Sequence, residues 1–273
     1  MHSWKKICSY TAAFCVAAGI GFGFYYKQAM QEMVKTSGII LEYHSISKQN
    51  WDPSLVIAPE VFEYHLQMLQ KNNYKIVTVA ELAERLRKGE SVDHYVAMSF
   101  DDGYKDNYTA ALPLLMKYNA KATFSVIPGK IGGEIYMNEA EINKMIDAGM
   151  EIGSHTCSHN PLAIIDPKYL TWEIGSSQYI LEQKFPRIQI RTLAYPNGSY
   201  NAEVIKHLQK YEYGQALTGH TGVTDAKIIK ETPMELNRVI VIDDGKGQDY
   251  FMGLLKRGYR RSLFLKWGID LGD

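Results

Sequence analysis

The sequence predicts an α/β fold in which parallel strands and helices alternate within a single domain. Short apolar runs of strand length alternate with amphipathic helical patterns from about residue 38 to residue 257. Polar clusters directly follow several of the apolar runs, and no internal repeat, low-complexity tract or interdomain linker interrupts the sequence. At 273 residues the chain is long enough to form one large hydrophobic core.

The predicted elements follow one another in a regular order. Pro59 stands at the first helical position, where proline is favoured, and Gly89 and Gly149 are typical helix stops. The predicted strands are Gly38–Tyr43, Tyr74–Val77, Tyr95–Phe100, Ala122–Ile127, Met150–Ser154, Thr192–Tyr195 and Val239–Ile242. The predicted helices are Pro59–Leu69, Val79–Leu86, Asn107–Tyr118, Glu139–Ala148, Lys168–Phe185, Asn201–Tyr211 and Tyr250–Arg257.

The composition excludes some classes of protein. The 30 basic residues balance the 30 acidic ones, so the net charge is zero, whereas a nucleic-acid binder normally shows a basic excess. We therefore expect no nucleic-acid partner. The 19 tyrosines are compatible with stacking on sugar rings, although tyrosine is also common in cores and at their rims.

The N-terminus reads as a membrane segment. Lys5 and Lys6 precede an apolar run, Ile7–Tyr26, of about the twenty residues that a spanning helix needs. Positive charge before the run predicts that the N-terminus lies inside and the rest of the chain outside. The alternative is a secretory signal cleaved after the small residues at 16–19, which would release the protein from the membrane.

From these observations we expect the chain to have three regions and its domain to lie outside the cytoplasm. They are a cytoplasmic tip with a single-pass membrane anchor at residues 1–27, a polar stalk at 28–36, and a catalytic domain at 37–273 outside the cytoplasm. Of the three cysteines only Cys157 falls in the domain, so no disulfide can form within it.

Three polar clusters mark the ends of predicted strands. They are Asp101-Asp102, His155 to His159 and Pro196-Asn197-Gly198. In β/α barrels the catalytic residues gather at the carboxyl ends of the strands. The three clusters are therefore expected to share one site.

The histidine pair is a candidate metal site. His155 and His159 are four residues apart, so on one side of a helical turn both imidazoles can reach one cation. Histidines at this spacing also occur on surfaces by chance, so the pair alone is weak evidence. Cys157 lies between them but points elsewhere, as expected of a small packing residue.

The two adjacent aspartates can divide two tasks between them. Consecutive side chains at a strand end point in opposite directions, so one carboxylate can bind a metal while the other stays free as a base. The alternative for Asp101-Asp102-Gly103 is an ordinary turn that caps the next helix.

Taken together, the two motifs resemble those of the polysaccharide deacetylases with a NodB-homology domain, carbohydrate esterase family 4. The family's first motif, Thr/Ser-Phe-Asp-Asp, corresponds to Ser99–Asp102, and its second, His-Ser/Thr-x-x-His, corresponds to His155–His159. Residues Ala122–Gly129 and Met150–Gly153 are also similar to the family's strands. The resemblance extends from about Ser37 to Arg257 and covers most of the chain.

The resemblance implies a deformed (β/α)7-type barrel and a set of roles. Asp101 is the implied general base, and Asp102, His155 and His159 are the implied ligands of a divalent metal, with Zn²⁺ preferred. Three protein ligands leave room for water and substrate, and a divalent cation makes bound water acidic. Two histidines and a carboxylate also fit a non-haem iron oxygenase, but the spacing and the additional free aspartate favour hydrolysis.

The sequence departs from the family's third motif, Arg-Pro-Pro-Tyr-Gly. This chain has Ala194-Tyr195-Pro196-Asn197-Gly198, which keeps the Pro-x-Gly turn. We therefore assign Tyr195, Pro196 and Asn197 to substrate binding, with a backbone N–H near Asn197 as a donor to the developing oxyanion. The motif's arginine is replaced by Ala194. Arg238 can supply the missing charge from another strand, or it can form a salt bridge at the rim.

The C-terminal histidine that supplies the general acid in the family is also absent, because no histidine follows His220. We predict that His44, after the first strand, is the acid and lies on the side of the metal opposite Asp101. The poly-N-acetylglucosamine deacetylases carry a similar Tyr-His. His220 is the second candidate, and a purely structural role remains the alternative for His44. The other domain histidines are expected on the surface, namely His65, His94 and His207.

The expected function is N-deacetylation of extracellular polymers that contain N-acetylglucosamine, either poly-N-acetylglucosamine or peptidoglycan. An O-acetyl esterase acting on xylan is the alternative within the same fold. A non-catalytic carbohydrate-binding relative is the third possibility, and the presence of all three ligands argues against it.

Overall fold

The computed structural model describes residues 21–49, 51–242 and 248–270. Its strands are β1 Ser37–Tyr43, β2 Ser45–Ile46, β3 Val56–Ile57, β4 Lys75–Val77, β5 Tyr95–Phe100, β6 Thr123–Val126, β7 Glu151–Ser154, β8 Thr192–Ala194, β9 Gln215–Thr221, β10 Thr224–Asp225 and β11 Leu236–Ile240. Its helices are residues 21–36, α2 Pro59–Lys71, α3 Val79–Arg87, α4 Leu112–Lys117, α5 Glu139–Asp147, α6 Ser177–Lys184, α7 Ala202–Lys210, α8 Ala226–Glu231 and α9 Gln248–Lys266. Wide helical turns at Asn107–Ala111 and Thr171–Ser176 lead into α4 and α6.

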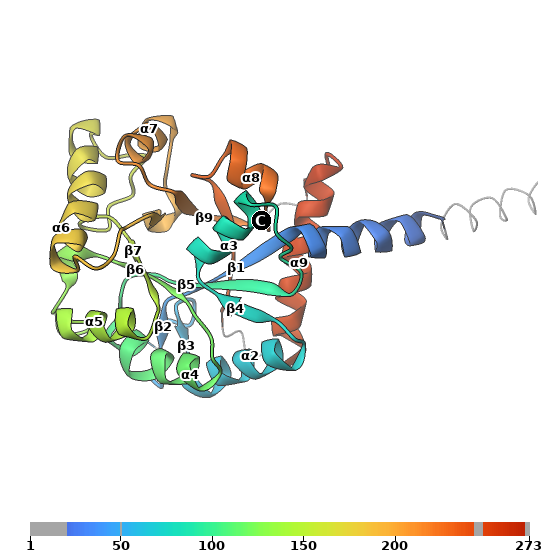
Figure 1. The fold of residues 1–273 in the computed structure, drawn as a ribbon, viewed down its shortest axis with the longest axis horizontal. Coiled ribbons are helices and arrows are strands. Elements are labelled where there is room, and N and C mark those ends of the chain that lie inside the picture. The colour runs from blue at the N-terminus through green and yellow to red at the C-terminus, as the bar shows by residue number, and fades with distance from the viewer. Residues whose placement is uncertain (1–20, 50, 243–247, 271–273) are drawn as a thin grey trace, which may run out of the picture.

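Seven parallel strands close into a barrel, as predicted. The order around it is β1, β11, β9, β8, β7, β6 and β5, and the pairing of β5 with β1 completes the ring. Figure 1 shows most of the helices around the outside of these strands.

The barrel is deformed because two strands have different neighbours at their two ends. At its start β5 pairs with β4, and only its last two residues pair with β6. In the same way β1 pairs first with the antiparallel β10 and later with β11. The ring is therefore complete only toward the carboxyl ends of the strands, which is the end that carries the polar clusters.

Helix α3 closes the opposite end of the barrel. Its first amide, at Val79, donates to Thr123 at the start of β6 (2.8 Å), and Glu151 at the start of β7 accepts hydrogen bonds from Thr123 and from Thr192. Leu82 lies so close to Gly38 that a Cβ there would come within 2.6 Å of it. Solvent therefore reaches the barrel from the carboxyl end.

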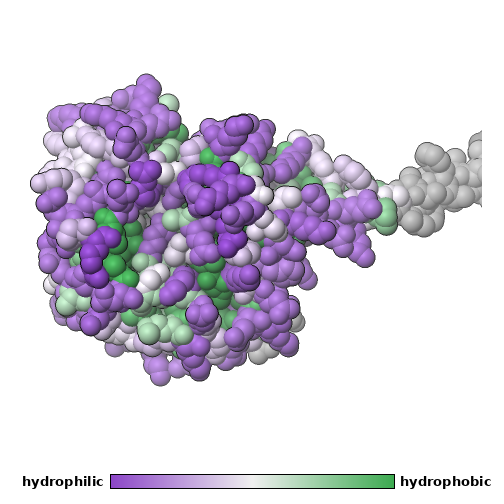
Figure 2. All heavy atoms as spheres, in the orientation of Figure 1, coloured by the Kyte–Doolittle hydropathy of each residue, from purple (hydrophilic) through white to green (hydrophobic). Residues whose placement is uncertain are grey.

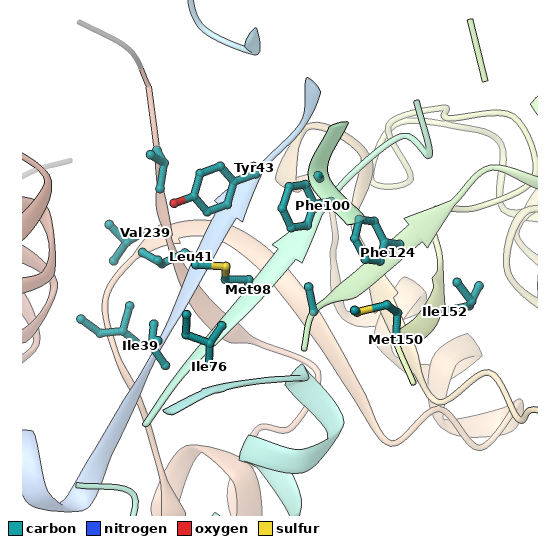
Figure 3. Close-up of a cluster of buried hydrophobic side chains, with 14 of the residues drawn as sticks. Ile39, Leu41, Tyr43, Ile76, Met98, Phe100, Phe124, Met150, Ile152 and Val239 are labelled. Carbon is teal, nitrogen blue, oxygen red and sulfur yellow. The ribbon is translucent and has the colours of Figure 1, made fainter. Parts of the chain in front are cut away.

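The strands β1 and β5 are buried along their whole length, which explains why they read as continuous apolar runs. Figure 3 shows aromatic rings side by side on β1, β5 and β6. The Phe100 ring lies 5.2 Å from that of Tyr43 and 4.7 Å from that of Phe124, both nearly parallel. These stacked rings pack outside the barrel against α2, where Phe62 meets Tyr43 edge-on.

The segment predicted as a polar stalk is helical instead. Met33 is buried and Met30 packs on the core, so one side of the helix at 21–36 belongs to the domain. Tyr25 stacks at 5.7 Å on Trp267, which directly follows α9, and the two helices cross in Figure 1. The surface shown in Figure 2 is mostly hydrophilic, with small separate apolar patches.

The described helices include none that is long and apolar enough to cross a membrane. Most of the predicted anchor, residues 7–20, lies outside the described residues, as do the predicted cytoplasmic tip and the alternative cleavage site.

Candidate active site

The loops that follow β5 and β7 bring one carboxylate and two imidazoles together. Asp102 Oδ1 lies 3.3 Å from His159 Nε2 and 3.7 Å from His155 Nε2, and the two imidazole rings are 4.7 Å apart. The three side chains form a group whose donor atoms all lie within 4.8 Å of one another. The structure thus brings together all three residues that the sequence predicted as ligands.

The backbone at these positions is unusual. Asp102, Thr156 and His159 all have a positive φ, between 63° and 71°, which non-glycine residues rarely adopt. Such conformations cost about 1–3 kcal/mol each and concentrate at functional sites. Here they turn the side chains of both loops toward one point.

Hydrogen bonds orient the ligand loop. His155 Nδ1 donates to the carbonyl of Ala194 at 2.8 Å, which leaves Nε2 with its lone pair toward Asp102. The buried carboxylate of Glu173 accepts from the amide of Ser158 (3.0 Å), from the Ser158 hydroxyl and from the side-chain amide of Asn160 (3.0 Å). Glu173 was missed from the sequence, because its partners are some fifteen residues away and no local pattern marks it.

A second cluster lies inside the barrel around Arg238. Its guanidinium donates to Asp101 Oδ2 at 2.8 Å, lies 3.1 Å from Glu42 Oε2, and also donates to the Thr218 carbonyl at 2.9 Å. Alternation along the strands explains the cluster, because Glu42 of β1 and Arg238 of β11 point inward and Asp101, directly after β5, continues the inward face of that strand. Arg238 thus stands in the place that the sequence hypothesis gave it, against the candidate base.

Opposed electrostatic effects shift the pKa values of Asp101 and Glu42 in opposite directions. For Asp101 burial favours the neutral form, but the charges of Arg238, His155 and His44 outweigh it and lower the pKa to about 2. For Glu42 burial is the largest effect, and with the charges of Asp101 and Asp102 it raises the pKa despite Arg238. Arg238 thus holds Asp101 in its ionised form, whereas burial disfavours the ionised form of Glu42.

The two carboxylate oxygens of Asp101 differ in their hydrogen bonding. Oδ2 is held by Arg238, while Oδ1 is buried and has no hydrogen-bond partner among the described residues. A buried acceptor without a hydrogen-bond partner destabilises the fold, so we expect a water molecule or a substrate group to donate a hydrogen bond to Oδ1.

His44 lies near Asp101 and Glu42 at the rim of the barrel. Its ring nitrogen forms a group with carboxylate oxygens of Glu42 and Asp101 within 4.8 Å, and the distance from Nε2 to Glu42 Oε1 is 3.9 Å. Its place on the side of the metal opposite Asp101 stays a prediction. Its position at the catalytic rim, directly after β1, agrees with the sequence, and its role as an acid stays a prediction.

The three residues assigned to substrate binding have different positions. The prediction is wrong for the side chain of Tyr195, which is 1% exposed and donates its hydroxyl hydrogen bond to the Met234 carbonyl at 2.9 Å. Pro196 is buried as well, whereas Asn197 is exposed with φ 54°. The amides of Gly198 and Ser199 close the turn onto the preceding carbonyls, so Asn197 carries the candidate oxyanion amide.

The remaining histidines and the cysteine divide between rim, surface and core. His220 is exposed near the end of β9 and lies edge-on to Tyr200 at 6.2 Å. His65 is 5% exposed and stacks on Phe251 at 4.0 Å, so its predicted surface position is wrong. Burial lowers the pKa of His65 to about 3. Cys157 is buried as predicted, and burial raises its pKa to about 12.

A wall of aromatic side chains borders the metal-ligand group. Tyr104 stacks on Tyr136 at 5.5 Å and meets the exposed Trp51 edge-on, also at 5.5 Å. Burial, together with a hydrogen bond to Asp102, raises the pKa of the Tyr104 hydroxyl. The wall is thus attached directly to a candidate ligand.

The donor set fits a divalent metal. In a tetrahedral zinc site with bonds of about 2.0–2.1 Å, neighbouring ligand atoms lie about 3.3 Å apart. The two distances from Asp102, 3.3 and 3.7 Å, are close to this value. Within the described residues no lysine or arginine forms an ion pair with Asp102, so the carboxylate lacks an internal cation.

Comparisons with known proteins agree with this geometry. Residues 88–216 match the polysaccharide deacetylase family. YxkH of Bacillus subtilis, provisionally named a polysaccharide deacetylase, is 35% identical over 184 residues, which cover 67% of this chain and 64% of YxkH. The poly-beta-1,6-N-acetyl-D-glucosamine N-deacetylase of Staphylococcus epidermidis is 27% identical over 223 residues, covering 70% of this chain and 76% of that enzyme.

Solved structures show the same architecture. The Streptococcus pyogenes deacetylase PplD, in complex with acetate, superposes with a TM-score of 0.72 at 27% identity, over 77% of this chain and 94% of PplD. IcaB from Ammonifex degensii shares the fold at 20% identity, with a TM-score of 0.71 over 82% of this chain and 97% of IcaB.

The fold and the site define a (β/α)7 barrel with an Asp-His-His group at the carboxyl-end rim of its strands. The chain contains a polysaccharide deacetylase domain, the domain of carbohydrate esterase family 4. The matched region spans slightly less than two thirds of YxkH.

Proposed function

We propose that the protein is a metal-dependent N-deacetylase of extracellular polysaccharides that contain N-acetylglucosamine. The observation that carries the proposal is the division of the Asp101-Asp102 pair. Asp102 joins two histidines and has no lysine or arginine partner among the described residues. Asp101 is held by Arg238, and its Oδ1 has no partner in the same part of the chain. A metal ligand and a base side by side are what hydrolysis of an acetamide requires.

Two further observations support a carbohydrate substrate. The relatives include enzymes named for poly-beta-1,6-N-acetyl-D-glucosamine, and they cover about 70% of this chain. The wall of Trp51, Tyr104 and Tyr136 offers aromatic surface next to the ligand group, suited to stacking on sugar rings.

In the proposed mechanism Asp102, His155 and His159 hold the metal, and their one oxygen and two nitrogen donors suit Zn²⁺. The cation supplies Lewis-acid chemistry, because it makes water acidic and polarises a carbonyl oxygen. Asp101 accepts the proton of the attacking water at Oδ1, while Arg238 holds Oδ2 and fixes the orientation of the carboxylate. The amide of Asn197 donates to the oxyanion that forms on the acetyl group.

The departing amine must be protonated as the C–N bond breaks. We assign this proton to His44, which stands at the rim with Glu42 3.9 Å from its Nε2. A histidine suits the task because its ordinary pKa lies near neutrality. His220, near the end of β9, is the second candidate, and its side chain is more exposed than that of His44.

The proposed location follows from the N-terminal sequence. Residues 1–27 would hold the enzyme in the cell membrane as a single-pass anchor, with the domain outside the cytoplasm. Protease added to intact cells should digest the domain, and membrane fractionation should recover the chain with its first residues intact. A soluble, shortened product in the medium would show instead that the segment is a cleaved signal.

The activity is tested by incubating purified protein with poly-N-acetylglucosamine, chitin and peptidoglycan fragments, and with acetylated xylan as the competing substrate. Mass spectrometry of released acetate and of the product should show loss of acetyl groups from nitrogen on at least one of the first three. Release from xylan alone would establish the O-acetyl esterase. No release from any of them, by protein with metal bound, would overturn the proposed function.

A further inference from the structure

A second concave site lies next to the metal-ligand loop. It has a volume of about 450 Å³ and lies between the loop after β7 and the helical segment that precedes α6. Its lining residues are Ser158, Asn160, Ile165, Tyr169, Trp172 and Glu173. None of them serves the proposed chemistry directly, so the pocket is free for another purpose.

The lining combines exposed aromatic surface with polar groups. Trp172 and Tyr169 are 54% and 53% exposed, although large aromatic side chains are normally buried. The amide nitrogen of Asn160 donates to Ser158 and Glu173, while its side-chain oxygen is not engaged by any described residue. Aromatic faces beside an available hydrogen-bond acceptor suit a sugar ring, whose two faces are apolar and whose edge carries hydroxyl groups.

The pocket is built rigidly and in fixed relation to the metal-ligand group. Ser158 and Asn160 flank His159 in the chain, so the wall begins about 4 Å along the backbone from a candidate ligand. Glu173 is 3% exposed and accepts hydrogen bonds from both flanking residues. The Trp172 carbonyl accepts from Cys157 Sγ at 3.1 Å, which anchors the aromatic side of the pocket to the same loop. A preformed site loses little entropy on binding.

We propose that this pocket binds a sugar residue of the polysaccharide, adjacent to the one whose acetyl group is removed. The inference rests on the proposed function, because it assigns a second binding position to the same substrate. It follows that the enzyme should prefer oligosaccharides to single sugars, and that the preference should depend on Trp172 and Tyr169.

The test compares Trp172→Ala and Tyr169→Ala with Tyr179→Ala. Tyr179 is an equally suitable aromatic control, since it is 64% exposed on α6 and does not line the pocket. Acetate release is measured on N-acetylglucosamine oligomers of increasing length and on a small activated acetate ester. Each pocket variant should lose about 10-fold in kcat/KM on the longer oligomers, mainly through KM, with little change on the ester. Tyr179→Ala should behave as the parent protein.

An unchanged length preference in both pocket variants would overturn the inference, as would an equal loss in Tyr179→Ala or an equal loss on the ester. Calorimetric binding of a long oligomer to Asp101→Asn protein, with and without Trp172→Ala, gives a readout that needs no turnover. Binding that weakens with Trp172→Ala would support the pocket even if no acetate were released. Absence of acetate release by the parent protein, in contrast, counts only against the proposed function.

Discussion

The Arg238 cluster and the Asp102 group differ in the source of their positive charge, although adjacent residues supply a carboxylate to each. Asp101 is buried against Arg238, so the protein itself provides its cation. In the described part of the chain the only ion-pair partners within 4 Å of the Asp102 carboxylate are the imidazoles of His155 and His159, and no lysine or arginine is among them. The arginine keeps Asp101 ionised and fixes its orientation, so that its second oxygen is placed to accept a proton, whereas a carboxylate among imidazoles without an arginine is arranged to bind a metal from solution.

The same comparison explains why the cluster around Arg238 is not a second metal site. Glu42, His44 and Asp101 also place donor atoms within 4.8 Å of one another. The Arg238 guanidinium already lies against both carboxylates, 2.8 Å from Asp101 and 3.1 Å from Glu42, so a cation of the protein occupies the place that a dication would take. The predictions below test that contrast.

The largest effect is expected from removing a ligand. His155→Ala should lose the metal and reduce activity to background, because the remaining Asp102 and His159 cannot hold a divalent ion tightly. Elemental analysis of the purified protein checks the metal, and acetate release checks the activity. His94→Ala is the matched control, since His94 is an exposed histidine whose neighbour is Asp93. Full metal occupancy in His155→Ala would remove His155 from the site.

The proposed acid comes next. His44→Ala should keep the metal and the fold yet lose at least about 10²-fold in kcat on an amide. Its loss should be milder on an activated ester, whose leaving group needs no proton. His220→Ala, assayed in parallel, should have the smaller effect. A larger loss from His220→Ala, or equal losses of His44→Ala on both substrates, would exclude His44 as the acid.

Arg238→Met should reduce kcat/KM by about 10–100-fold, as expected for a residue that orients a catalytic group through a hydrogen bond. The acid limb of the pH profile should also move to higher pH. In the parent protein Arg238 contributes to a pKa of about 2 for Asp101, so the carboxylate stays ionised at all assay pH values. Without Arg238 burial dominates and raises that pKa. Arg238→Lys keeps the charge but loses the planar guanidinium. Its kcat/KM and the position of its acid limb should therefore lie between those of the parent protein and of Arg238→Met. An acid limb that does not move would show that Arg238 leaves Asp101 unaffected.

The smallest effect, on stability alone, is expected at His65. Its folded pKa of about 3 lies below the ordinary value of 6.5, so between these values the unfolded chain binds a proton that the folded chain does not. Its contribution to stability is therefore complete above pH 6.5 and falls as the pH drops toward 3, with a limiting slope of about 1.4 kcal/mol per pH unit. Urea unfolding at pH 7 and pH 5 should show a smaller difference in His65→Gln than in the parent protein. Equal differences in the two proteins would contradict the assignment.

Two local motifs, taken together with the family resemblance, were sufficient to predict the metal-ligand group. Asp102, His155 and His159 lie in two short motifs directly after apolar strands, and parallel strands place such loops at one rim. The order of strands and helices could also be predicted, because each element is marked by hydrophobic periodicity over a few residues. The seven-strand closure came from the family resemblance.

What the sequence did not show depends on contacts between distant strands. Glu42 was overlooked although a charged residue inside the apolar run of β1 was a usable signal, because its meaning depends on the pairing of β1 with β5 and β11. Tyr195 was misassigned because a motif does not reveal on which side of the turn a side chain packs. His65 could have been placed correctly, since it shares the apolar helix face of Phe62, Leu66 and Leu69.

The most direct test of the division between the two aspartates is a paired measurement on Asp101→Asn and Asp102→Asn. Metal content by elemental analysis and acetate release are measured on the same preparations of each. Asp101→Asn should keep about one metal per chain and lose about 10²–10⁴-fold in rate, because only the proton acceptor is missing. Asp102→Asn should lose the metal and with it the activity. If Asp101→Asn loses the metal while Asp102→Asn retains it, the assignment of the two carboxylates is reversed and the account is wrong.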